Sequence, residues 1–417
     1  MKISNRVLYP DFITLQEVSM RYIFAILLFM VNPFLCVGFM IFFTMLSQSK
    51  EVTWIKMFLF LLALFMGLIQ STRIIKFGEP SDWPMYMNYF SEADGKDLMT
   101  YMQTGYMRET SKEPVYRIIN YLGFYVFGGN FVLFAATLVF TMYFSFYQAI
   151  YKFWKASFTD VRLLIAAIVL FTFITENFGI TNNLLRQQFA TGIMSYVIAS
   201  KVVDNKMNWW LALVACFIHT SMFVYLLILF IKPLYEIIRP KYMLWFCGIL
   251  IIGGFIMQRI SFFANLFSFS DTLSYGLYRV SKLNDLYENP DVMSNTTVYY
   301  NIGLFLLVTL KLNYIDTPVN RSQIFYTNLL FFVFLLCAVF SFAPLLQIRL
   351  YISRFFLMPF VVPLLFHRQP FINRIYLWSI VVFFLMRFFV SFDRMHDGEF
   401  FPSINSLVYN SVFHYFP

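Results

Sequence analysis

Long apolar stretches follow one another along this chain from residue 22 to its end, and short polar segments separate them. An uncharged stretch of about 20 residues is long enough to cross a bilayer as a helix, and roughly ten stretches meet that measure. Helices satisfy their backbone hydrogen bonds inside lipid, whereas open sheets cannot. The pattern therefore predicts an all-α, polytopic integral membrane bundle of about 10–12 transmembrane helices, with external loops that carry short helices.

The predicted spans are separated by charged or turn-forming residues. They are Tyr22–Leu46, Met57–Thr72, Asn130–Tyr151, Val161–Phe178, Leu184–Val203, Trp209–Ile231, Met243–Met257, Val298–Leu312, Ile324–Ala343, Arg354–Phe366 and Ile375–Phe392. The uncharged run that ends at residue 151 is too long for one crossing, and Gly128-Gly129-Asn130 is a turn signal in its middle. We therefore expect an interfacial helix after Glu113-Pro114, followed by a separate span.

The polar segments divide the chain without marking a soluble domain. Residues 1–417 are interpreted as a single integral membrane domain, with a polar leader at 1–21 that does not resemble a cleavable signal peptide. Two large external loops are expected at 73–113 and 258–297, and an external tail at 393–417. Loops of this size usually have a function.

Lysine and arginine gather in alternate loops, which is typical of the cytoplasmic side of a membrane protein. The alternation holds along the whole chain only if Trp209–Ile231 does not cross once. We predict a bend near His219-Thr220-Ser221, with two half-helices that return to the starting side, or a compensating crossing nearby. A single ordinary span with an imperfect charge rule is the alternative.

Composition excludes several other classes of protein. The chain is 60% hydrophobic with 55 Phe, so it is not a soluble protein. Its net charge of +9 comes from loops beside the spans, where lysine and arginine contact anionic lipid headgroups rather than nucleic acid. The four cysteines lie in apolar runs with no Cys-x-x-Cys pair, so neither a disulfide framework nor a zinc site is indicated. No glycine-rich phosphate loop is present, so ATP hydrolysis is unsupported.

Two polar residues stand out inside or beside the spans. His219 lies within an apolar run, where a polar residue either serves function or bonds a neighbouring helix. Arg186 opens a span in the sequence Asn182-Asn183-Leu184-Leu185-Arg186-Gln187, where it either extends toward the interface or binds an anion. The guanidinium fork matches phosphate oxygens, so this cluster favours an anion such as a diphosphate.

External loops supply the other candidates. Asp82 with Tyr86 combines a carboxylate with aromatic faces, as sugar-binding sites do, although a charged loop with scattered aromatics has the same composition. Further candidates in the loops or beside them are Arg73, Glu113, Tyr116, Ser221, Arg349 and Arg354.

These residues, in this order, resemble the EpsG family of bacterial polysaccharide polymerases, which is related in role to Wzy-type O-antigen and capsule polymerases. The motifs are Arg73, Asp82-x-x-x-Tyr86, Glu113-Pro114-Val115-Tyr116, Asn183-Leu184-Leu185-Arg186-Gln187, Phe217-x-His219-x-Ser221 and a late arginine, Arg349 or Arg354. The resemblance covers most of 67–221 and, more loosely, the rest of the chain. Arg73 and Asp82 are farther apart than in the family pattern.

The resemblance implies a membrane glycosyltransferase in the bacterial cytoplasmic (inner) membrane. It would join oligosaccharide repeat units carried on undecaprenyl diphosphate into O-antigen, capsule or exopolysaccharide at the outer face. No cofactor, metal or nucleic acid is implied, and a polysaccharide chain-length regulator is a possible partner.

The expected roles of the site residues follow from this chemistry. His219, Arg186, Asp82 and Glu113 are the expected catalytic residues. The expected substrate contacts are Arg73, Tyr86, Tyr116, Asn183, Gln187, Ser221, Arg349 and Arg354.

Two rival functions remain open at this point. A flippase or transporter of the same lipid-linked saccharide would usually contain internal repeats and paired broken helices, and only one break is indicated here. A membrane O-acyltransferase that modifies glycans would also use a buried histidine.

Overall fold

The computed structural model describes residues 11–76, 82–104, 113–174, 177–179, 181, 184–236, 252, 320–339, 353, 356–366, 372–397 and 400–415. Within these ranges every regular element is a helix, so the predicted all-α class is confirmed. The buried apolar side chains form one large core that reaches from the first helix to the last.

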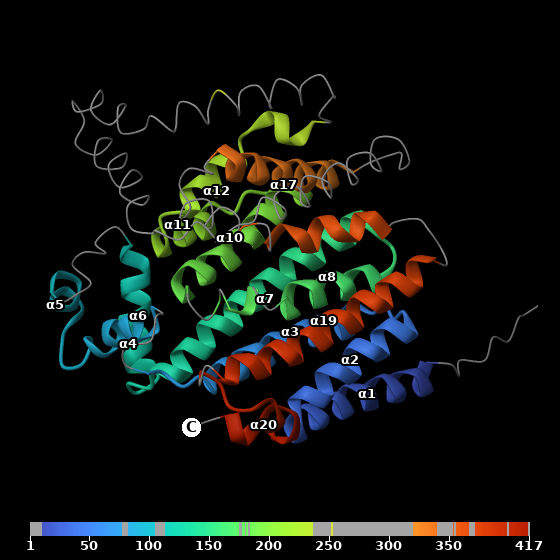
Figure 1. Cartoon of the computed structure of the whole chain (residues 1–417), viewed down its shortest axis with the longest axis horizontal. Coiled ribbons are helices and arrows are strands. Elements are labelled where there is room, and N and C mark those ends of the chain that lie inside the picture. Colours follow the sequence, from blue (N-terminus) through green and yellow to red (C-terminus); the bar gives the residue numbers. More distant parts are fainter. Residues whose placement is uncertain are drawn as a thin grey trace, which may run out of the picture.

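A set of roughly aligned helices forms the body of the molecule (Figure 1). They are α3 (Val52–Ser71), α7 (Phe131–Ser157), α8 (Val161–Phe173), α10 (Leu185–Asp204) and α19 (Ile372–Asp397). Helix α7 packs against both α3 and α10. A Cβ atom on Gly192 would lie 2.7 Å from the Met142 carbonyl oxygen, so this glycine allows the backbones of α10 and α7 to approach closely.

Two of the described helices, α3 and α7, are long and apolar enough to cross a membrane. Five shorter apolar segments accompany them: Met20–Val31, Pro33–Ser47, Val161–Phe173, Trp209–Ile218 and Leu377–Val390. Helix α19 leaves Val382, Met386 and Val390 exposed along one face. Such an apolar surface is typical of a contact with lipid or with another protein.

Three short helices, α4 (Trp83–Ser91), α5 (Leu98–Gln103) and α6 (Pro114–Val126), lie together at one end of this body (Figure 1). Helix α6 ends at Val126 and is followed by a turn that contains Gly128 and Gly129, which have φ of 56° and 78°. The Asn130 side chain then accepts a hydrogen bond from the Leu133 N–H (3.1 Å) and caps the next helix, α7. The predicted division of the long uncharged run is therefore confirmed.

The segment after α10 is broken at the predicted place. Helix α11 (Trp209–Ile218) and helix α12 (Met222–Ile228) are separated by His219, Thr220 and Ser221. The ring of Trp209 at the start of α11 stacks on Phe230, which follows α12, with 5.8 Å between ring centroids. The two half-helices therefore return to the end where they began, as predicted, and the single-span alternative is wrong. We call this element the re-entrant hairpin.

The first predicted span, Tyr22–Leu46, is wrong. Helix α1 (Asp11–Val31) begins within the predicted leader, and α2 (Pro33–Ser47) runs back along it. The Cys36 Sγ atom lies 3.2 Å from the Ala25 carbonyl oxygen, a contact that one continuous helix does not allow. The physical reason is Asn32, whose side chain accepts from the Leu35 N–H (2.9 Å), while Pro33 starts a new helix.

The C-terminal residues fold back onto the same end of the body as α4 and α6. Helix α20 (Ile404–Tyr409) and the 3₁₀ turn η6 (Val412–Tyr415) follow α19. The Ile74 N–H donates to the Phe400 carbonyl oxygen (3.0 Å), and the Asn32 amide donates to the Val408 carbonyl oxygen (2.6 Å). The predicted external tail is therefore packed against the ends of α2 and α3.

The other predicted spans agree with the structure to different extents. Leu184–Val203 matches α10, and Ile375–Phe392 lies within α19. Helix α8 ends at Phe173, short of the predicted Phe178. Helix α17 (Arg321–Val339) covers most of Ile324–Ala343, and residues 356–366 are helical. Met243–Met257 (residue 252 excepted), Val298–Leu312 and the loop 258–297 lie outside the described residues.

Candidate active site

Two prolines place carboxylates at helix starts. Pro84 is the second residue of α4, which begins after Asp82, and Pro114 is the first residue of α6, which begins after Glu113. Proline favours the first turn of a helix because the N–H that it lacks has no partner there in any case. Neither Asp82 nor Glu113 bonds the backbone of its own helix start. Both carboxylates are therefore available to groups on other elements.

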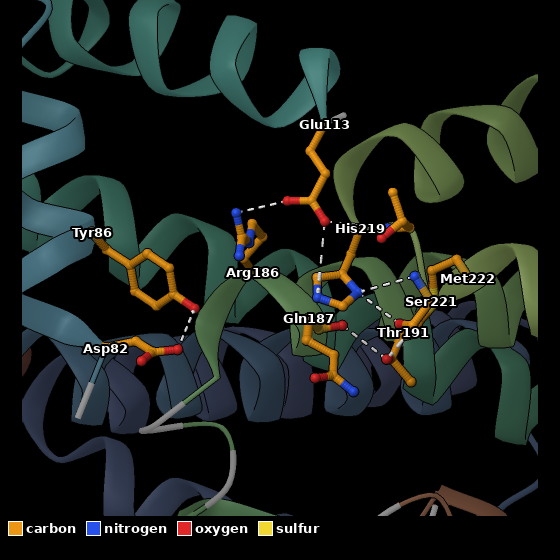
Figure 2. A network of polar contacts seen from close by, with 10 residues as sticks. Asp82, Tyr86, Glu113, Arg186, Gln187, Thr191, His219, Ser221 and Met222 are labelled. Atoms are coloured by element: carbon orange, nitrogen blue, oxygen red, sulfur yellow. Dashed lines mark hydrogen bonds and ion pairs between the residues drawn. The ribbon is translucent and has the colours of Figure 1, made fainter. Parts of the chain in front are cut away.

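Glu113 joins α10 to the tip of the re-entrant hairpin (Figure 2). Its Oε2 atom lies 2.7 Å from an Arg186 guanidinium nitrogen. Its Oε1 atom accepts a hydrogen bond from the Thr220 N–H (3.2 Å) and lies 4.0 Å from His219 Nε2. The side chains of Glu113, Arg186 and His219 are 9%, 16% and 17% exposed, so the three groups meet in a largely buried space, where the attraction between Glu113 and Arg186 is stronger than in water.

Ser221 contacts the other ring nitrogen of His219. Its Nδ1 atom lies 2.6 Å from the Ser221 hydroxyl oxygen, and the break between α11 and α12 turns the ring toward Glu113 (Figure 2). Ser221 was predicted as a substrate contact, but its observed partner is His219. A hydrogen bond at one ring nitrogen fixes which nitrogen is presented to the site.

An aromatic wall connects this network to Asp82. The Tyr86 hydroxyl donates to Asp82 Oδ2 (3.2 Å), and the Tyr86 ring packs edge-on against Tyr116 (6.3 Å between centroids). The Tyr116 ring in turn lies 5.6 Å from the Arg186 guanidinium carbon. Five predicted site residues, Asp82, Tyr86, Glu113, Tyr116 and Arg186, are therefore brought together with His219.

Burial keeps both tyrosines uncharged. It raises the pKa of Tyr86 well above its ordinary value, and nearby Tyr116 and Asp82 raise that pKa further. Burial also raises the pKa of Tyr116 to about 12. Both phenols are therefore neutral at physiological pH and act as hydrogen-bonding and stacking groups.

Comparison with known proteins shows the family of this chain. The model of the EpsG family matches residues 56–410, which is most of the chain. The chain belongs to the EpsG family. EpsG is a family of Wzy-like polymerases, so membership connects this chain with polysaccharide biosynthesis and with membranes. No curated protein and no solved structure matches the chain significantly.

Arg73, another predicted site residue, has a different environment from Arg186. Its guanidinium carbon lies 4.8 Å from the centroid of the Trp83 ring, 5.4 Å from Phe400 and 5.8 Å from Phe401. These aromatic contacts connect the end of α3 to α4 and to the C-terminal segment. Its role as a substrate contact stays a prediction, and the observed contacts favour a role in positioning Asp82, which directly precedes Trp83.

The remaining predicted site residues divide into two groups. Gln187 lies beneath His219 in the view of Figure 2, and its carbonyl oxygen accepts from the Thr191 hydroxyl (2.8 Å). Asn183, Arg349 and Arg354 lie outside the described residues. Among the side chains that are described, no three His, Cys, Asp or Glu residues converge as ligands for a metal ion.

The sequence reasoning missed one member of the network, the backbone N–H of Thr220. A helix break leaves N–H groups without intrahelical partners, so the predicted bend at residues 219–221 already implied donors there. Their alignment with Glu113, 107 positions earlier in the chain, depends on tertiary packing.

Proposed function

We propose that this chain is a membrane glycosyltransferase that polymerises oligosaccharide repeat units carried on undecaprenyl diphosphate. The products would be O-antigen, capsule or exopolysaccharide chains. The observation that carries the proposal is the Glu113 carboxylate, which joins Arg186 to the His219 tip. A cationic group for a leaving diphosphate and a proton acceptor for an incoming hydroxyl are the two requirements of this transfer.

Arg186 serves the leaving group. In the reaction, the acceptor hydroxyl oxygen forms a bond to the anomeric carbon of the growing chain, and the bond from that carbon to the diphosphate oxygen breaks. The diphosphate leaves with the electron pair, and the guanidinium balances the charge that develops. In the described structure the Arg186 guanidinium is paired with Glu113. When the substrate binds, the diphosphate oxygens replace the Glu113 carboxylate as the partner of the guanidinium.

His219 serves the incoming nucleophile. With Nδ1 held by Ser221, Nε2 faces Glu113 Oε1 at 4.0 Å. A hydroxyl oxygen placed beside this pair can lie about 2.8 Å from both atoms at once. The imidazole takes the hydroxyl proton at Nε2, and the Glu113 carboxylate stabilises the imidazolium that forms.

Asp82, Tyr86 and Tyr116 serve the acceptor sugar. Asp82 has carboxylate oxygens for sugar hydroxyls, and the two buried tyrosine rings pack behind it and position it. Tyr116 contacts both Tyr86 and Arg186, so a sugar bound at Asp82 lies close to the leaving group.

The location of basic residues supports a site that faces outward from the cytoplasmic membrane. Lys152, near the end of α7, pairs with Asp204, the last residue of α10. These C-terminal helix ends lie at the end of the body opposite α4 and α6 (Figure 1). Arg321, the first residue of α17, lies over Tyr235, which follows the re-entrant hairpin. Basic residues of this kind mark the cytoplasmic side of membrane proteins. The end that carries Arg186 would then face outward.

We expect single cysteines at Lys206 and Lys232, in a background without native cysteines, to be labelled by an impermeant maleimide only after the membrane is opened. A cysteine at Tyr409, which is 80% exposed at the other end, should be labelled on intact cells. Labelling of Lys206→Cys and Lys232→Cys from opposite compartments would contradict the re-entrant topology.

Reconstitution tests the function itself. The purified protein in liposomes, supplied with lipid-linked repeat units, should convert them into a ladder of longer lipid-linked chains without ATP or nucleotide sugar. Movement of unextended units across the bilayer would instead indicate a flippase. Acyl transfer without a change in chain length would indicate an O-acyltransferase, and either result would overturn the proposal.

A further inference from the structure

The C-terminal segment, residues 400–415, is attached to the end of α3 at two points. The Ile74 N–H, just after α3, donates to the Phe400 carbonyl oxygen (3.0 Å). The Ser71 hydroxyl, on the last residue of α3, donates to the Tyr415 carbonyl oxygen (2.5 Å). The first and the last part of the segment are therefore both held at this helix end, on the side of the body that carries α4.

Arg73 lies between these two attachment points in the chain and connects the C-terminal segment to α4. Its side chain is buried, and its guanidinium carbon is 4.8 Å from the ring centroid of Trp83, 5.4 Å from that of Phe400 and 5.8 Å from that of Phe401. A cation at this distance is attracted to a ring, and the attraction increases when water is excluded. The guanidinium therefore holds the rings of the two phenylalanines and of Trp83 around one charge.

Trp83 transmits this contact to Asp82. Trp83 is the first residue of α4, its side chain is buried, and its ring packs edge-on against Phe131 at the start of α7 (5.7 Å between centroids). Asp82 directly precedes it and accepts a hydrogen bond from Tyr86. The position of Asp82 therefore depends on how firmly Trp83 is held.

Phe401 also reaches the part of the chain that leads to Arg186. Its ring is buried and lies 5.4 Å from the ring of Phe178 and 5.4 Å from the ring of Phe392 on α19. Phe178 lies between α8 and α10, and Arg186 is the second residue of α10. The C-terminal segment therefore contacts the approaches to both Asp82 and Arg186, which come from distant parts of the chain.

We propose that the aromatic pair Phe400–Phe401 is a positioning element for the acceptor. It holds Arg73 against Trp83 and so keeps Asp82 in place relative to Arg186. The inference rests on the proposed function, in which Asp82 binds the acceptor sugar. Neither ring contacts the Glu113 network, so loss of a ring changes acceptor binding more than the chemical step.

Phe400→Ala tests the proposal, because it removes one ring and keeps the backbone carbonyl that accepts from Ile74. The rate of a single transfer in liposomes is measured against the concentration of lipid-linked acceptor at saturating donor. A cation–ring contact is worth roughly two- to thirtyfold in an equilibrium constant, so we expect the acceptor KM to rise about three- to tenfold. The kcat should stay within about twofold.

Two further variants control this measurement. Phe400→Tyr keeps an aromatic ring beside Arg73 and should restore the acceptor KM of the unchanged protein. Phe413→Ala removes a phenyl ring of the same segment that is 70% exposed, and it should change neither kcat nor KM. Phe400→Leu keeps apolar volume without a ring and replaces Phe400→Ala if that variant unfolds.

A spin label on α4 gives a readout that does not depend on the reaction. Asn88→Cys places the label on an exposed position of α4, and Thr137→Cys places it on an exposed position of α7 as a reference, both in a background without native cysteines. Electron paramagnetic resonance reports the mobility of each label. We expect Phe400→Ala to raise the mobility of the label at Asn88 and to leave that of the label at Thr137 unchanged.

Unchanged mobility at Asn88, or an unchanged acceptor KM in an active protein, would overturn the proposal. Equal increases at Asn88 and Thr137 would also overturn it, since they would indicate a general loss of structure. A lower kcat with an unchanged acceptor KM would show that the segment acts on the chemical step instead. A selective increase at Asn88 in a protein that forms no polymer in liposomes would support the positioning of α4 and contradict only the proposed function.

Discussion

Arg186→Ala should reduce the rate of polymer formation about 100- to 1,000-fold, the range found when a single group that stabilises transition-state charge is removed. The guanidinium is the cation that contacts the carboxylate network at the start of α10, and its loss leaves the departing diphosphate without this partner. The measurement is the length distribution of lipid-linked chains made by purified variants in liposomes. We expect Arg186→Ala to leave mainly single repeat units.

A loss of folding must be separated from a loss of chemistry, because Arg186→Ala leaves the buried Glu113 carboxylate without its ion-pair partner. Arg186→Ala combined with Glu113→Gln removes that unpaired charge and should recover thermal stability but not polymer. Arg186→Lys retains the charge without the fork and should be intermediate. Arg162→Ala, which breaks the ion pair with Asp160 at the opposite end, is the matched control. Long chains from Arg186→Ala would remove the proposed role.

Glu113→Gln should lower the transfer rate about 100- to 10,000-fold, the usual contribution of positioned acid–base groups. Glutamine keeps an oxygen that can accept the Thr220 N–H, so the tip should stay in place. The negative charge opposite His219 Nε2 is lost, however, and the imidazolium is no longer stabilised. The rate of a single glycosyl transfer, measured under saturating donor, reports this loss.

His219→Ala provides the second arm of the same experiment. When two residues act as a unit, removing either one removes most of the effect of both. The double variant Glu113→Gln/His219→Ala should therefore be no slower than the slower of the two single variants. Multiplied losses would mean that Glu113 and His219 act independently. Asp94→Asn removes an exposed acid from the turn after α4 and should have no effect.

The sequence predicted the fold best where turn chemistry interrupts an apolar run. Gly128-Gly129-Asn130 and the polar triplet at residues 219–221 were both recognised as breaks, and both are breaks in the structure. Asn32-Pro33 carries an equally local signal, but the surrounding apolar run was long enough for one crossing and was interpreted as a single helix. Hydrophobic length alone therefore did not distinguish a span from a hairpin.

The sequence predicted which residues form the site better than it predicted which residues contact one another. Arg186, His219, Glu113, Asp82, Tyr86 and Tyr116 were all nominated from residue type and position, and the structure brings them together. Ser221 bonds His219, and Arg73 stacks on Trp83. These partners depend on how α3, α4 and the C-terminal segment pack, which local patterns do not encode.

The most direct measurement is an electron cryomicroscopy structure of the full chain in nanodiscs with a bound lipid diphosphate. We expect the Arg186 guanidinium to contact the phosphate oxygens and to have left Glu113 Oε2, while Glu113 still accepts from the Thr220 N–H and faces His219. A diphosphate bound elsewhere, with Arg186 still paired to Glu113, would contradict the proposed role of Arg186.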